Sequence, residues 1–153
     1  MKKNFLINQG IELTVGAQCY DLHNFYDVTS IIMNESEGLI INFSPSDGFE
    51  KNRSSLCLKF SDIEHMSYHL DMASVSTLDI DEAGYKSSDD FDLEWLKSEE
   101  QSDTNDHFVL RFMKEDYIRV YASKAELILA EGNVTLNALT AISLNRHSSS
   151  SQL

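Results

Sequence analysis

The feature that most constrains the fold is a period-two alternation of apolar and polar residues late in the chain. Apolar side chains occupy every second position from Phe108 to Phe112, and a second run places Ile118 and Val120 on one face. Successive side chains of a strand point to opposite faces of a sheet. Residues 108–113 and 117–121, joined by a compact turn, are therefore predicted to form an antiparallel hairpin.

Earlier parts of the chain show the same alternation. A second hairpin is predicted to turn at residues 34–38, and Pro45 should end its second strand. These runs predict a mainly β or α+β fold: an antiparallel sheet, sandwich or partly open barrel with a long acidic loop and one or two short helices. The earlier strands are expected at residues 26–33, 39–43 and 56–60, with a weak strand at 75–80.

Two segments leave alternatives open. Residues 61–64 fit either a short helical turn or a bulged continuation of the preceding strand. Residues 123–129 fit either another strand or a short helix, and residues 134–144 are mixed in period. The chain has 153 residues, a length typical of one domain. We expect a single globular domain over residues 1–146 and a frayed tail at 147–153, where serines accumulate.

The charge is strongly negative. The chain has 12 Lys and Arg against 25 Asp and Glu, a net charge of −13. Such a surface repels nucleic acids and anionic membranes, whose binding needs Lys and Arg. It attracts cationic proteins and speeds their association, although a charge far from zero can also serve solubility alone.

The acid is concentrated in residues 84–106. Trp95, the only tryptophan, sits in the middle of this stretch with Phe91, Leu93 and Leu96, so the segment has an apolar side able to dock as a strand or short helix. We predict a tethered acidic loop that meets a cationic partner. The residues expected to bind it are Asp89, Asp90, Asp92, Glu94, Trp95, Glu99 and Glu100.

A second candidate surface lies on the last hairpin. Tyr117, Arg119 and Tyr121 share a strand face, and Arg111 lies on the face of the preceding strand that avoids the apolar side chains. If the two faces coincide, they form an aromatic and arginine patch, a composition enriched at interface hot spots. The alternative is a half-buried second sheet face, with the arginines paired to the acidic loop.

Catalytic and metal-binding patterns are weak. Asp79, Asp81 and Gly84 match the start of a calcium loop, but Ala83 and Asp90 replace expected ligands. His65 and His69 could share zinc only on a helix. Since no nucleophile elbow or phosphate-binding glycine loop is present, we expect no enzyme activity, no cofactor and no metal.

The two cysteines indicate a reducing compartment. Cys19 and Cys57 lie in no close motif, and Cys57 falls in an alternating run where a buried free thiol is expected. The apolar stretch at residues 5–7 is too short for an export signal. No apolar run approaches the ~20 residues of a membrane span. We therefore expect a cytoplasmic protein with two free thiols.

The segments YDVTSI (26–31), LIINF (39–43) and LCLKF (56–60), followed by Ile63, give a broader pattern. Over roughly residues 20–70 it resembles small β-rich immunity proteins of bacterial toxin systems. The resemblance implies a cytosolic, non-catalytic protein that binds one toxin domain and blocks it. Since nuclease toxins are commonly basic, an acidic surface agrees with this interpretation.

Three functions remain open at this stage. We favour an immunity protein whose acidic surface occupies the basic substrate groove of a toxin. The alternatives are a generic β-rich adaptor or structural module, and a small-ligand or metal-binding β-barrel, which could include an enzyme.

Overall fold

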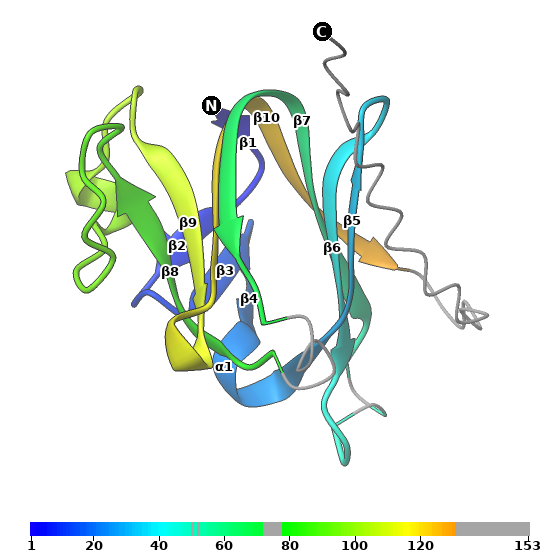
Figure 1. The fold of residues 1–153 in the computed structure, drawn as a ribbon. Coiled ribbons are helices and arrows are strands. Elements are labelled where there is room, and N and C mark those ends of the chain that lie inside the picture. Colours follow the sequence, from blue (N-terminus) through cyan, green and yellow to red (C-terminus); the bar gives the residue numbers. More distant parts are fainter. Residues whose placement is uncertain (50, 52, 72–77, 131–153) are drawn as a thin grey trace, which may run out of the picture.

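The computed structural model describes residues 1–49, 51, 53–71 and 78–130. Most of these residues lie in antiparallel strands, as the alternation predicts, and the larger sheet is curled into a half-barrel (Figure 1). A short strand, β1 (Lys2–Lys3), pairs in parallel with β10 (Tyr117–Ala130). The order across the larger sheet is β5 (Tyr26–Asn34), β6 (Gly38–Pro45), β7 (Ser55–His69), β10 (Tyr117–Ala130), β9 (His107–Phe112) and β8 (Ile80–Lys86).

Both predicted hairpins are confirmed. Strands β5 and β6 pair in antiparallel fashion, from Tyr26 opposite Pro45 to Asn34 opposite Gly38. Strands β9 and β10 pair with Tyr117 opposite Arg111, and the 3-10 turn η4 (Met113–Glu115) connects them. The predicted turns therefore lie where the alternation breaks.

The two open alternatives both resolve to strand. β7 continues through residues 61–64 as a bulged strand: its register shifts between Tyr121 and Ala122 of β10, and Asp62 adopts a φ of 54°. β10 likewise extends through residues 123–129. Extra residues at a bulge bend a strand, which fits the curl of the sheet.

The boundaries near the acidic stretch differ from the prediction. β8 begins at Ile80, while residues 75–77 of the predicted weak strand lie outside the described residues. Residues 84–86 belong to β8, so the acidic excursion begins at Ser87 rather than at 84. The segment 134–144 and the predicted tail at 147–153 also lie outside the described residues.

A second, smaller sheet was not predicted. β2 (Leu6–Asn8), β3 (Glu12–Val15) and β4 (Gln18–Asp21) pair in that order. The one-turn helix α1 (Leu22–Phe25) follows, and the Asp21 side chain accepts a hydrogen bond from the Asn24 amide at its start. These strands have three or four residues, too few to display an alternating pattern.

One hydrophobic core joins the two sheets. Alternate residues of β7 (Leu56, Leu58 and Phe60) are 0–1% exposed, and they belong to the same cluster as Phe5 and Leu13 from the N-terminal segment. Burying each such side chain contributes roughly 1.5–3 kcal/mol. The interior of the half-barrel is thus filled by side chains.

Cys57 lies on the opposite face of β7 and is half-buried, not buried as expected. Cys19 on β4 is exposed, and neither cysteine is in a disulfide. Among the described residues, no helix is long and apolar enough to cross a membrane.

The two edges of the large sheet differ. At the β8 edge, the Ala83 amide donates to the Gly10 carbonyl, and Tyr85 exchanges two backbone hydrogen bonds with Lys97. At the other edge, β5 pairs along its described length only with β6. The first edge is covered by segments of the chain, while the second presents its backbone groups outward.

Candidate functional site

The two surfaces that the sequence predicts are in contact. Tyr117 pairs with Arg111 and Arg119 with Val109, so these side chains share one face of the hairpin, as the prediction required. We call it the outer face, because the core lies on the other side. Residues 87–106 connect β8 to β9, and we call them the 87–106 loop. The loop contacts Arg111 and Arg119 on the outer face and lies beside β8 and β9 (Figure 1).

Arg119 holds the first part of the loop. Its guanidinium donates to the backbone carbonyls of Ser87 and Asp90, both at 2.6 Å, and its Nε donates to Nδ1 of His107 at 3.1 Å. The ring of Phe91 lies 5.6 Å from the guanidinium carbon. Arg119 is only 3% exposed, so it anchors the loop and is not available to a partner.

Arg111 holds the next part. Its Nη1 donates to the carbonyls of Leu93 and Glu94, at 2.6 and 3.2 Å. Its Nη2 forms ion pairs with Asp81 and Glu82 of β8, both at 2.8 Å. The sequence allows either an exposed interface patch or a half-buried sheet face, and the half-buried face fits these contacts better. The arginines bind the loop through its backbone carbonyls, however, and Arg111 forms its ion pairs with carboxylates of β8 and not of the loop.

Gly84 allows the loop to approach β8 closely. A Cβ atom at this position would lie 2.6 Å from Cβ of Leu96 and 2.8 Å from the carbonyl oxygen of Lys97. Real side chains do not approach so closely. Only glycine therefore permits the backbone hydrogen bonds between Lys97 and Tyr85, which measure 2.8 and 3.0 Å.

The end of the loop is closed by a partly buried ion pair. Nζ of Lys97 contacts both carboxylate oxygens of Asp106, at 3.0 and 2.9 Å, and the Asp106 side chain is 2% exposed. The same carboxylate accepts a hydrogen bond from the Asp103 amide. Acidic residues at this end stabilise the loop itself.

Glu99 is also structural. It lies in the 3-10 turn η3 (Glu99–Gln101), and its carboxylate accepts hydrogen bonds from Lys3, from the Ile7 amide and from the Tyr85 hydroxyl. Burial alone would raise the pKa of Glu99, but these donors outweigh it and lower the pKa. Burial, together with the same pairing to Glu99, raises the pKa of Tyr85. Glu99, expected to contact a partner, instead ties the loop to the N-terminal segment.

Two further predicted residues are partly engaged within the loop. Asp90 pairs with Lys86 at 3.0 Å and accepts from the Asp92 amide, and these hydrogen bonds lower its pKa. Asp92 accepts from the Glu94 amide at 2.8 Å. Both carboxylates fix turns. Both oxygens of Asp90 are engaged, whereas Oδ2 of Asp92 accepts no hydrogen bond from a described residue.

The aromatic side chains of the loop face outward. Phe91 is 83% exposed and Trp95 is 79% exposed, while Leu93 and Leu96 are half-buried. Residues 91–96 contain neither a strand nor a helix. The expectation that this segment docks as a strand or a short helix is wrong. It is attached instead by hydrogen bonds from the two arginines to the loop carbonyls and by the close contact of the loop with Gly84.

Three predicted carboxylates remain available. Asp89, Glu94 and Glu100 are exposed, and their side chains form no hydrogen bond or ion pair with any described residue. Together with Phe91 and Trp95 they form what we call the loop crest. An ordered loop that presents large aromatic rings among free carboxylates has the chemistry of a protein-binding surface.

The tyrosines border this region. Tyr117 and Tyr121 are half-exposed, and the ring of Tyr121 stacks on His107 at 5.2 Å. The ring of His65 lies 4.9 Å from that of His107. Burial, the Arg119 charge and His65 together lower the pKa of His107. Since Nδ1 of His107 accepts a hydrogen bond from Arg119, it carries no proton.

The metal patterns are not assembled. His65 and His69 lie four residues apart on β7, a strand rather than a helix. The calcium-like segment forms β8, where Ala83 and Gly84 are buried in the sheet. The described residues contain no group of three or more potential ligands arranged around a metal position.

Comparison of the chain with protein-family models, with curated proteins and with solved structures gives no match.

Proposed function

We propose that this chain is a non-catalytic binding protein that captures a cationic protein domain through the loop crest, and that this domain is a toxin which the chain neutralises. The exposure of Phe91 and Trp95 on an anchored acidic loop carries the proposal. The resemblance of residues 20–70 to immunity proteins supports the toxin as the partner. The net charge of −13 supports a basic one.

The geometry favours binding for an energetic reason. Exposed aromatic rings gain their burial free energy only when a partner covers them. Because Arg111, Arg119 and Gly84 already hold the loop, little conformational entropy is lost on association. The free carboxylates around the rings steer a cationic surface toward them.

The adaptor and small-ligand alternatives have less support. An adaptor would fit the same surface but does not explain why acid and aromatic residues share one loop. A ligand-binding barrel needs an interior cavity, and the half-barrel interior is filled by core residues such as Phe43, Phe60 and Phe108.

The first test looks for a toxin reading frame adjacent to the gene for this chain and measures association with its toxin domain as a function of ionic strength. Replacing Asp89, Glu94 and Glu100 by their amides should slow association by roughly tenfold at low salt and flatten its salt dependence. These positions are chosen because their carboxylates bind nothing within the described residues, so the fold should be unaffected.

A matched control removes the same amount of charge elsewhere. Asp47→Asn, Glu64→Gln and Glu115→Gln alter exposed carboxylates outside the loop crest. This control should keep most of the association rate and of its salt slope. Equal effects of the two triple variants would mean that the acid acts only through net charge.

The second test concerns the anchor. Trp95→Ala should increase dissociation and weaken affinity by roughly 30-fold or more, the effect of losing a hot spot of about 2 kcal/mol. Toxin activity should be inhibited by the parent protein and correspondingly less by the variant. Unchanged affinity would place the binding surface elsewhere, and failure of the parent to bind or inhibit would refute the proposed function.

A further inference from the structure

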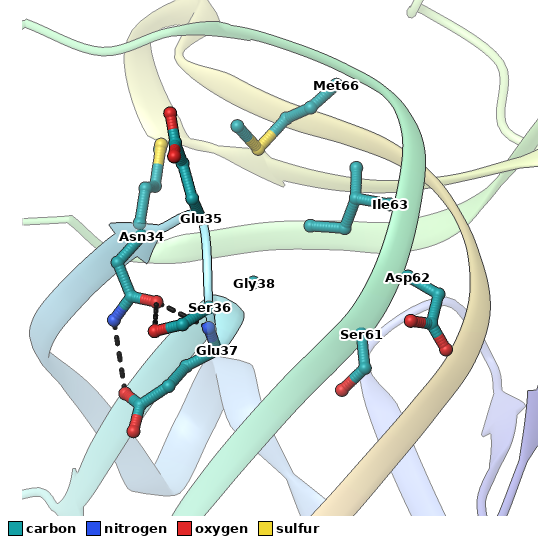
Figure 2. A pocket seen from close by; sticks show the side chains of 10 residues that line it. Asn34, Glu35, Ser36, Glu37, Gly38, Ser61, Asp62, Ile63 and Met66 are labelled. Carbon is teal, nitrogen blue, oxygen red and sulfur yellow. Dashed lines mark hydrogen bonds between the residues drawn. The ribbon is translucent and has the colours of Figure 1, made fainter.

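A separate groove lies away from the loop crest, between the turn of the β5–β6 hairpin and the bulge of β7 (Figure 2). Its volume is about 520 Å³, within the range of roughly 300–1,000 Å³ that is typical of ligand sites. The lining residues are Met33, Asn34, Glu35, Ser36, Glu37, Gly38, Ser61, Asp62, Ile63 and Met66.

The apolar part of the groove is formed by Met33, Ile63 and Met66. All three are half-buried and pack against the hydrophobic core. Ile63 and Met66 extend from β7 toward the hairpin turn (Figure 2). Methionine side chains are flexible and polarizable, so they adapt well to an inserted aliphatic chain.

The polar part of the groove is acidic. Glu35, Glu37 and Asp62 line it, and none of its ten lining residues is basic. Glu37 accepts a hydrogen bond from Asn34 at 3.1 Å. The carboxylates of Glu35 and Asp62 form no hydrogen bond or ion pair with any described residue, and both residues are exposed.

The walls of the groove are held in place by the backbone. A Cβ on Gly38 would lie 2.1 Å from the carbonyl oxygen of Phe60, so the turn sits directly against β7. Asn34 fixes the turn by accepting hydrogen bonds from the Glu37 amide and the Ser36 hydroxyl. Asp62 adopts a φ of 54°, a left-handed conformation that is uncommon for residues other than glycine. The groove is therefore a preformed feature of the bulge and the turn.

We propose that this groove holds a lysine or arginine side chain from a segment of another protein. The aliphatic stem lies on Met33, Ile63 and Met66, and the cationic head group meets the carboxylate of Glu35, while Asp62 adds to the negative potential of the rim. Long basic side chains bury their methylene groups on apolar surface while the charge stays at the polar rim. Charge complementarity selects this occupant, because an anionic or uncharged group would leave the carboxylates without a counterion.

The proposal does not depend on the function of the loop crest. The groove is built from β5, β6 and β7, whereas the crest lies beside β8 and β9 at the other edge of the sheet. Either surface can therefore fail its test without affecting the other.

The experiment uses methyl-labelled methionine in the full chain, observed by NMR. A blocked Gly-Lys-Gly peptide should shift the methyl signals of Met33 and Met66 in a saturable manner. Met1 and Met113 lie outside the groove, so their signals should not move. Saturation at millimolar concentrations would be consistent with an open site.

Two further peptides measure separately what the aliphatic stem and the positive charge of lysine contribute to binding. Norleucine in place of lysine keeps the stem and removes the amine, and it should bind at least several-fold more weakly. Diaminopropionic acid keeps the amine and removes three methylene groups. Its binding should weaken by up to roughly fourfold for each methylene that is buried.

Protein variants supply the remaining controls. Glu35→Gln combined with Asp62→Asn should weaken the lysine peptide at least several-fold, and asparagine tolerates the left-handed backbone at 62. Glu64→Gln removes a neighbouring carboxylate that does not line the groove and should have little effect. Equal binding of the norleucine and lysine peptides, or equal shifts at Met1, Met33, Met66 and Met113, would overturn the proposal.

Discussion

Replacing Gly84 with alanine should loosen the 87–106 loop without unfolding the sheet. The new Cβ would lie 2.6 Å from Leu96 Cβ and 2.8 Å from the Lys97 carbonyl, so the loop backbone must move away. Two backbone hydrogen bonds between Lys97 and Tyr85 then weaken, at about 1 kcal/mol each, and the half-buried Leu96 loses about 1 kcal/mol of contact. Because Gly84 does not have a left-handed φ, alanine recovers up to about 1 kcal/mol by restricting the unfolded chain.

The net cost is about 2 kcal/mol, most of it local to the loop. Hydrogen exchange at the Lys97 and Tyr85 amides should accelerate by roughly 30-fold, the factor that corresponds to this free energy. The amide of Leu110, in the ladder between β9 and β10, should change much less. Ser88→Ala, at an exposed position of the same loop, is the control and should leave all three amides unchanged. Normal protection of Lys97 in the alanine variant would show that the loop is not attached through Gly84.

Three other properties can be checked directly. The pKa of His107 is lower in the folded protein than the ordinary histidine value of 6.5. As the pH falls through 6.5, the unfolded chain therefore binds more protons than the folded protein does. Stability should therefore fall as the pH decreases from 7 to 5, and His107→Gln should reduce this dependence in chemical unfolding measured across that range. Exposed Cys19 should react with a thiol reagent in the native protein faster than half-buried Cys57, and equal rates would contradict the structure. Phe60→Ala should lower the free energy of unfolding by about 3–5 kcal/mol, since the ring is fully buried, and a loss below 1 kcal/mol would contradict its central position.

The predictable part of the fold is the part where one sheet face is buried. β5, β6, β7, β9 and β10 alternate because Leu58, Leu110 and their neighbours face the core while adjacent residues face outward. β1 to β4 could not be recognised, since their pairing depends on distant partners and each strand has at most four residues. The sequence of β8 resembles a calcium loop because it is rich in acidic residues. In the fold, Arg111 neutralises two of these residues, Asp81 and Glu82, and local sequence does not reveal this contact.

Only the outline of the candidate region follows from the sequence. The shared face of Arg111 and Tyr117 follows from strand alternation and is confirmed by their register. That Arg119 is covered by the loop cannot be derived from local pattern, because Ser87 and Asp90 supply backbone carbonyls and any residue type could do so. The exposure of Trp95 was likewise not predictable, since apolar residues in a polar loop are more commonly buried.

The unequal edges of the large sheet have a consequence for how copies of the molecule behave in concentrated solution. No strand of the described residues pairs with the outer side of β5, and Ile32 on this strand is 41% exposed. An exposed strand edge of this kind is a template on which fibrils and precipitates grow. A net charge of −13 keeps neighbouring molecules apart at neutral pH and low salt. The carboxylates that attract a cationic partner therefore also protect the protein against aggregation by mutual repulsion. This protection weakens when acid protonates the carboxylates or when salt screens the repulsion between molecules.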